Sequence, residues 1–216
     1  MKNKKRGLIL SATIIGATVF SSSLLLNKED ASGIQIEQIS SSELTEVKQT
    51  KTEIHGLVEV YSFQESVEIS DLIAKVRIDA LDEELSKPAP ATIFNATVLE
   101  VFKGNGEQLD NINILQEGNS EFIFNNMELF EPGEEVILFM GQSKENPNRY
   151  WIRSGEANIY KIKEKEVVKE AWADEYLNDI TTNVKEVKNT KKQYFEEDKF
   201  IKKLVKEIDK IEKEEK

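Results

Sequence analysis

The side chains with the most potential for chemistry in this sequence are one histidine and several pairs of adjacent glutamates. His55 is the only imidazole and the chain has no cysteine, so multi-histidine and thiolate metal sites are excluded. Paired carboxylates could act as the acid and base of a hydrolase. Adjacent strand residues point to opposite faces, however, so such pairs do not share one site. The pairs considered are Glu83/Glu84, Glu134/Glu135 and Glu214/Glu215.

Other catalytic arrangements are missing from the sequence. A Ser-His-Asp triad would need His55, which lies in a polar segment beside Gly56 and is expected on the surface. No phosphate-binding glycine loop, EF-hand loop or kinase signature occurs. We therefore predict no catalytic, cofactor-binding or metal-binding residues and no cofactor, and the binding residues stay unknown. The alternative is a carboxylate-based envelope hydrolase, in which folding brings two acids together in a cleft.

Aromatic side chains offer a second type of site. They are interleaved along the middle of the chain and could form a stacking surface for a ligand. Aromatic residues in strands more often belong to the core, which is the simpler interpretation. The six candidates are Phe122, Phe124, Phe130, Phe139, Tyr150 and Trp151.

Composition limits the partners further. The 216 residues suffice for one compact domain with additional segments, and 39% of them are hydrophobic. The formal net charge is −11, and residues 57–160 alone hold 7 basic and 19 acidic residues. Such an acidic segment repels phosphate backbones, so we predict no nucleic-acid partner.

The N-terminus has the pattern of an export signal or a membrane anchor. Four basic residues within residues 1–7 precede residues 8–26, which carry no charge and are long enough to approach bilayer thickness. Basic residues stay on the cytoplasmic side, so the rest of the chain is expected on the outer face of the membrane. Two alternatives stay open for residues 1–26: an uncleaved single-pass anchor, or a signal peptide cut after Ser23 with the domain secreted.

The middle of the chain has the pattern of a small β-barrel. Residues 27–56 are polar and predict a flexible spacer, and residues 57–169 then show strand patterns without intervening amphipathic helices. A parallel α/β sheet is therefore excluded, which leaves a small antiparallel barrel or a sandwich. Residues 64–71 predict a short helical turn, and residues 57–63 a first strand or a lead-in.

Individual strands follow from local signals. Residues 72–81 alternate apolar and polar side chains, and residues 82–90, with two prolines, predict a loop. A phase change near Val98–Leu99 predicts a β-bulge. Pro132-Gly133 predicts a type II turn before residues 134–141, whose apolar run indicates burial on both faces. Further strands are expected at 111–118 and 121–124, with a closing hairpin around Ser154-Gly155.

Four stretches carry a family pattern: Ser70-Asp71-Leu72-Ile73, Val101-Phe102-Lys103-Gly104, Leu129-Phe130 and residues 132–139. Together they resemble the netrin/TIMP-like (NTR) branch of the OB-fold, and cell-envelope proteins of Gram-positive bacteria with the same pattern. The resemblance implies a mainly β protein with a small OB-like barrel. It also implies a non-catalytic extracytoplasmic binding protein, in its most specific form a regulator or inhibitor, with an unknown envelope protein or ligand as partner. TIMP-type inhibitors chelate zinc through an N-terminal cysteine, which this chain lacks, so no functional residue transfers.

Residues 170–216 are predicted to form a charged connector and a C-terminal helix. Residues 171–193 have sparse apolar positions and indicate a marginal helix or a connector. Residues 196–213 repeat apolar side chains at helical spacing, in a stripe about 120° wide. We expect this amphipathic helix to dock onto the barrel; self-association, a partner contact or membrane-surface binding are the alternatives. The predicted docking residues are Ile201, Leu204, Val205 and Ile208.

Overall fold

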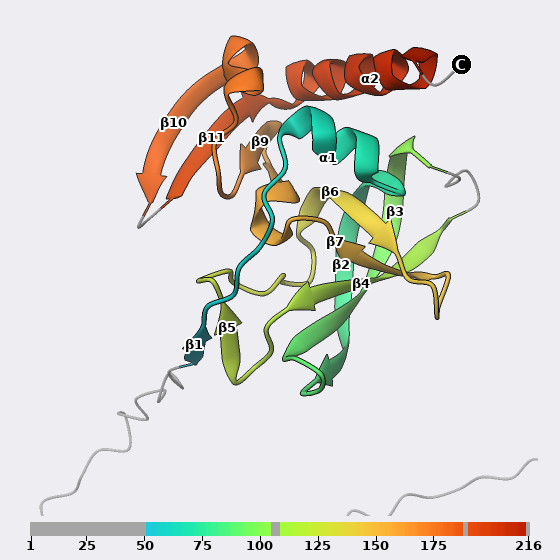
Figure 1. Ribbon diagram of the computed structural model, residues 1–216, viewed down its shortest axis with the longest axis vertical. Helices are drawn as coiled ribbons and strands as arrows, with labels where there is room; N and C mark the ends of the chain where they lie inside the picture. Colours follow the sequence, from blue (N-terminus) through green and yellow to red (C-terminus); the bar gives the residue numbers. More distant parts are fainter. Residues whose placement is uncertain (1–50, 105–108, 188–189, 215–216) are drawn as a thin grey trace, which may run out of the picture. The chain divides into compact units, whose positions relative to one another are not determined.

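A nine-stranded, largely antiparallel sheet dominates the fold, and part of it closes into a barrel (Figure 1). The computed structural model describes residues 51–104, 109–187 and 190–214. The predicted signal or anchor segment and the spacer up to residue 50 lie outside these residues, so both stay predictions. Within the described ranges, no helix is both long enough and apolar enough to cross a bilayer.

The barrel has five strands and confirms the predicted mainly β class. β2 pairs with both β3 and β6, and β3 pairs with β4. β7 closes the ring, since it pairs in parallel with β4 and antiparallel with β6. The strands are β2 (Leu72–Leu85), β3 (Ala91–Lys103), β4 (Asn111–Glu117), β6 (Glu135–Gln142) and β7 (Arg149–Ile152).

The structure confirms the predicted β-bulge but shortens the predicted loop between β2 and β3. Lys75 pairs with Glu100 and Val76 with Val98, so Leu99 is the extra residue of the predicted bulge. The loop predicted at 82–90 is too long, because β2 continues to Leu85, where it still pairs with β3. The end of this strand gives no apolar alternation in the sequence, because its side chains, several of them acidic, are exposed on both faces of the sheet.

β6 is buried on both faces, as its apolar run predicts. Val136 and Leu138 point into the barrel core, whereas Ile137 and Phe139 belong to a second core outside the barrel. The turn before β6 is type II: Gly133 has a φ of 91°, and the Glu134 N–H donates to the carbonyl of Glu131 at 3.1 Å.

The sheet extends beyond the barrel, and here the sequence interpretation is wrong in two places. The hairpin expected around Ser154-Gly155 does not form, because β7 and β8 pair with opposite ends of β6 and not with each other. A short 3-10 helix, η1 (Gly155–Asn158), connects them. The extension continues in the order β8 (Ile159–Lys163), β9 (Glu166–Lys169), β11 (Thr190–Glu196) and β10 (Thr181–Val187).

The segment predicted as a connector is the second error. It contains the 3-10 helix η2 (Glu175–Ile180), strand β10 and the start of β11. One buried position of β11 is occupied by Gln193, whose amide oxygen accepts from the Asp174 N–H at 2.9 Å and whose amide nitrogen donates to Thr181 Oγ1 at 2.7 Å. A polar side chain satisfied by such tertiary bonds removes the apolar alternation that would have indicated a strand.

Two helices cover the second core. α1 (Phe63–Ile69) begins with a capping box between Ser62 and Glu65, and confirms the predicted helical turn. α2 (Glu197–Glu214) confirms the predicted C-terminal helix. It contacts the second core, in which Phe63, Phe139, Tyr160 and Phe195 also pack, and not the barrel interior.

The docking face of α2 is partly as predicted. Leu204 and Ile208 are buried, and Ile201 is half-buried against the second core. Val205 is 40% exposed, so its predicted contact is wrong. The buried face of α2 includes Phe200, which is fully buried, so this face begins one residue before Ile201, the first residue of the predicted stripe.

The predicted spacer ends earlier than residue 56. β1 (Thr52–Ile54) pairs in parallel with β5 (Phe122–Phe124), whose existence was predicted. Leu57–Ser62 forms no strand and leads along the domain from β1 to α1 (Figure 1). The pairing was not predictable from the polar composition of the spacer, because backbone hydrogen bonds to β5 hold β1 in place.

Candidate functional site

The residues singled out from the sequence do not assemble into one site. His55 is exposed, and its Nε2 lies 3.6 Å from a carboxylate oxygen of Glu53. Glu84 accepts hydrogen bonds from the backbone and the hydroxyl of Ser120, both at 2.7 Å. Glu214 is the last described residue, and Glu215 lies outside the described part. Among described residues, no group of three or more acidic, histidine or cysteine side chains could hold a metal ion.

The six aromatic candidates are also dispersed. Phe130 and Tyr150 belong to the barrel core, and Phe139 belongs to the second core. Phe122 and Phe124 are half-buried in β5. Trp151 alone is substantially exposed, and the Arg153 guanidinium lies 4.6 Å above its ring. The aromatic residues are therefore mostly core, and a common stacking face is not formed.

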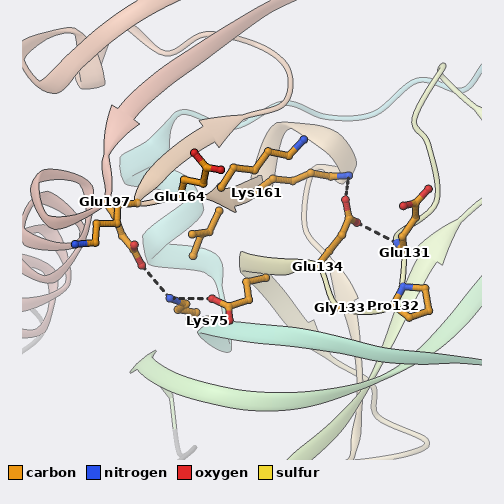
Figure 2. A pocket seen from close by; sticks show the side chains of 12 residues that line it. Lys75, Glu131, Pro132, Gly133, Glu134, Lys161, Glu164 and Glu197 are labelled. Atoms are coloured by element: carbon orange, nitrogen blue, oxygen red, sulfur yellow. Dashed lines mark hydrogen bonds and ion pairs between the residues drawn. The ribbon is translucent and has the colours of Figure 1, made fainter.

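Two hollows mark the surface of the described domain. The first, named here the charged groove, has a volume of about 560 Å³ and lies where the Pro132-Gly133 turn, the β8–β9 turn and the start of α2 come together (Figure 2). Its lining is almost entirely charged and contains both members of the predicted pair Glu134/Glu135.

Charges in this groove are largely neutralised by one another. Lys75 donates to Glu197 at 2.9 Å and lies 3.2 Å from Glu135, and Lys161 donates to Glu134 at 2.7 Å (Figure 2). Burial lowers the pKa of Lys75, but its hydrogen bonds to the two carboxylates outweigh burial and leave the pKa above its ordinary value. The Lys75–Glu197 pair joins the barrel to α2, and the Lys161–Glu134 pair joins β8 to the turn before β6, so these ion pairs have a structural role.

The second hollow, named here the Trp172 groove, combines different chemistry. It has a volume of about 370 Å³ and is lined by side chains from segments far apart in the sequence. Apolar lining comes from Met127, Phe130 and Ile159, which also contact the barrel core. The polar lining comes from His55, Asn125, Asn126, Glu128, Glu156, Lys161, Glu170, Thr190 and Lys192.

Local structure holds the rim of this groove. The Asn125 amide accepts from the N–H of Gly56 and donates to its carbonyl, both at 3.1 Å, so one side chain fixes the chain at the end of β1. The Phe124 ring packs so closely on Gly56 that a Cβ there would lie 2.5 Å from it. Trp172 follows β9 with a φ of 55°, and its N–H donates to Thr190 Oγ1 at 3.0 Å. Its side chain is 50% exposed at the groove.

The electrostatics of the Trp172 groove centre on Glu156, in η1. Burial raises the pKa of this carboxyl, and the negative charges of Glu170 and Glu117 raise it further, against the opposing charge of Lys192. Lys192 is itself ion-paired with Glu170. Among described residues, no hydrogen-bond donor or cationic side chain is bound to the Glu156 carboxyl, although its backbone carbonyl accepts from the N–H of Ile159. The groove therefore presents a half-buried carboxyl that no cation of the domain neutralises directly.

Sequence reasoning missed the residues that matter here. The sequence placed Glu156 in the predicted hairpin, directly after Ser154-Gly155. It placed Glu170 at the start of the charged connector, and Trp172 in a stretch predicted as a marginal helix or a connector. The only local signal was a large aromatic side chain, Trp172, in an otherwise polar stretch. No protein-family model matches the chain and no curated protein matches it, so the candidate site rests on its geometry alone.

Proposed function

We propose that the chain is a non-catalytic binding or interaction module of the bacterial cell envelope, displayed on the outer face of the membrane by residues 8–26 or secreted after cleavage. The basic residues before this uncharged segment support the orientation. The ring order β2-β3-β4-β7-β6, with β4 and β7 parallel, supports an OB-like barrel and agrees with the resemblance to the NTR branch.

The Trp172 groove is the observation that carries this proposal. Of the two hollows described, it is the one that offers an exposed aromatic ring, apolar walls and a carboxyl without an internal partner. Binding sites commonly combine apolar walls with a few polar groups that orient the ligand. The charged groove lacks this combination, because its principal carboxylates and lysines hold one another. A regulator or inhibitor acting on an envelope protein is the most specific form of the proposal.

Photocrosslinking in intact cells tests the binding role. A photoreactive residue at Val187, which lines the groove, should crosslink a discrete partner. The matched control is Val184 on the same strand, which is 45% exposed but does not line the groove. Equal crosslinking from both positions, or none from Val187, would contradict a binding role for this surface.

Protease accessibility tests the orientation separately. Protease added to intact protoplasts should digest the domain if residues 27–216 lie outside the cytoplasm. Complete protection, with digestion only after lysis, would contradict the proposed location. The supernatant of the culture distinguishes the anchored form from the secreted form, because only the cleaved domain accumulates there.

A carboxylate-based hydrolase is the second candidate, since one observation favours it. Glu156 and Glu170 line the same groove, and the pKa of Glu156 is raised, as a general acid requires. Incubation with cell-wall polymer should then release reducing ends, and Glu156→Gln should abolish the release. Absence of any release by the unmodified chain would leave the binding module as the sole proposal.

A further inference from the structure

We propose that the Trp172 groove binds an organic cation, namely a primary ammonium or guanidinium group carried on a short apolar stem. This inference rests on the proposed binding function and specifies the chemistry of its ligand. It follows from the charge balance of the groove, from its apolar wall and from a buried carboxylate oxygen beside it.

The charge balance of the groove is negative even after internal ion pairs are counted. Lys192 is taken by Glu170, and Lys161 is taken by Glu134, which does not line this groove. Glu156 and Glu128 then have no cationic side chain bound to them among the described residues. A ligand with one positive charge would supply the missing partner, whereas an anion would meet uncompensated carboxylates.

Glu117 strengthens this imbalance from inside the domain. Its Oε2 is buried and has no hydrogen-bond partner in the described part of the chain, and its charge raises the pKa of Glu156. Burial also raises the pKa of Glu117 itself. Glu117 does not line the groove, but while it is ionised its negative charge adds to that of Glu156 in attracting a cation.

The apolar side of the groove suits the stem and the charge of such a ligand. Met127, Phe130 and Ile159 offer a surface for methylene groups, as long cationic side chains require. The Trp172 indole is half exposed at the groove, and an indole is the best aromatic partner for a cation. The backbone of Trp172 has a φ of 55° and its N–H donates to Thr190 Oγ1, so the point at which the indole is attached is held beside the groove.

Size restricts the ligand to one side chain or one small amine. The volume of about 370 Å³ lies near the lower end of the range for small-molecule pockets. A lysine or arginine side chain of a partner polypeptide and a free aliphatic amine share the required chemistry. The experiment therefore includes one probe for each source.

The full chain in nanodiscs of zwitterionic phosphatidylcholine, which has no net charge, is titrated with two probes, acetyl-Gly-Lys-Gly-amide and cadaverine. The chain has two tryptophans, so two indole N–H resonances report on binding. We expect the Trp172 resonance to shift and saturate with either probe. The Trp151 resonance is an internal control, because Trp151 does not line the groove. Acetyl-Gly-Glu-Gly-amide, an anionic probe, should shift neither.

Three variants assign the binding to the groove. Glu156→Gln should weaken binding about tenfold, which corresponds to about 1.4 kcal/mol. Trp172→Asn should weaken it about threefold to tenfold, and asparagine tolerates the left-handed backbone. Glu164→Gln is the matched control: it removes the same charge from the charged groove and should leave binding unchanged. Thermal unfolding of each variant establishes that it is folded.

The pH dependence gives a signature that simple loss of packing would not. Affinity should fall as the pH is lowered from about 7.5 to about 5, because the raised pKa of Glu156 brings its protonation toward this range. In Glu156→Gln the fall should be reduced. Binding of the lysine peptide alone would identify a polypeptide source, and binding of both probes would admit a free amine.

Other results overturn the inference without touching the proposed function. Lack of saturable binding by either cation, equal binding of the anionic probe, or an unchanged affinity in folded Glu156→Gln would each refute it. If Val187 still crosslinks a partner in that case, the binding module stands and only its ligand chemistry is wrong. If crosslinking fails while a cation binds the groove, the site exists but the envelope partner does not.

Discussion

Lys169 is a buried lysine whose replacement should stabilise the protein. It is 4% exposed and donates to the carbonyl of Ala157, and Tyr160 Oη lies 3.4 Å from its ammonium. No carboxylate is bound to it within the described residues; Asp174 acts only through its more distant charge. Burial lowers the pKa of Lys169 to about 8, and Asp174 opposes this weakly.

The size of the effect follows from this pKa. The ordinary value is 10.5, so the native state lowers the pKa by about two and a half units. At about 1.4 kcal/mol per unit, keeping the charge buried destabilises the native state by about 3 kcal/mol below pH 8. Lys169→Met keeps most of the length of the side chain, removes the charge and loses two hydrogen bonds, to Ala157 and Tyr160, worth about 1 kcal/mol each. We therefore expect a net stabilisation of about 1 kcal/mol at pH 7.

The sign of the pH dependence is the sharper test. Below pH 8 both states are protonated, and the destabilisation is constant. Between pH 8 and 10.5 the native state loses its proton first, so the free energy of unfolding should rise with pH. The raised pKa values of Tyr160 and Tyr176 act in the opposite direction above pH 10, so urea unfolding is compared at pH 7 and at about 9.5. A flat profile for the unmodified chain, or a Lys169→Met variant less stable at pH 7, would refute the reasoning.

Three further predictions concern packing and a turn. Leu138→Asp should abolish cooperative thermal unfolding. An unpaired carboxylate in the fully buried barrel core costs several kcal/mol, whereas the free energy of unfolding of a typical domain is only about 5–15 kcal/mol. An unchanged melting curve would contradict the central position of β6. Phe200→Ala should lower stability in urea by about 3–5 kcal/mol. The exposed Val205→Ala on the same helix should change it by less than about 0.5 kcal/mol, and equal losses would contradict the observed docking face. Glu164 and Lys165 both have positive φ in the two-residue β8–β9 turn, a backbone conformation that Asn and Gly adopt more readily. The double change Glu164→Asn, Lys165→Gly should therefore raise the urea midpoint and increase stability by about 1–2 kcal/mol. An unchanged midpoint would argue against backbone strain in this turn.

The sequence was sufficient for the parts of the fold that depend on neighbouring residues. The alternation in β2 predicted the strand, the phase change at Leu99 predicted the bulge, and Pro132-Gly133 predicted the turn. The heptad-like spacing of Leu204 and Ile208 predicted the docked helix. In each case the side chains that carry the signal lie within a few residues of one another, so a local pattern contains the answer.

The extension was missed because its signals are not local. β11 holds the polar Gln193 at a buried position, and hydrogen-bond partners 12 to 19 positions away satisfy its amide. β7 and β8 have the sequence pattern of a hairpin, yet tertiary pairing with β6 directs them apart. Both errors affect the Trp172 groove, because Glu156 lies in the predicted hairpin that does not form and Trp172 lies in the segment predicted as a connector.

The pairing of β6 explains why a groove exists at this place. β7 occupies one end of an edge of β6 and β8 occupies the other end, so the chain must leave the barrel at η1 before it enters the extension. This crossing puts Glu156 at the junction of the two parts. Barrel-core residues such as Phe130 supply one wall, and Trp172, which follows β9, supplies the other. The groove is thus lined by residues from both parts, so its formation depends on the extension and not on the barrel alone.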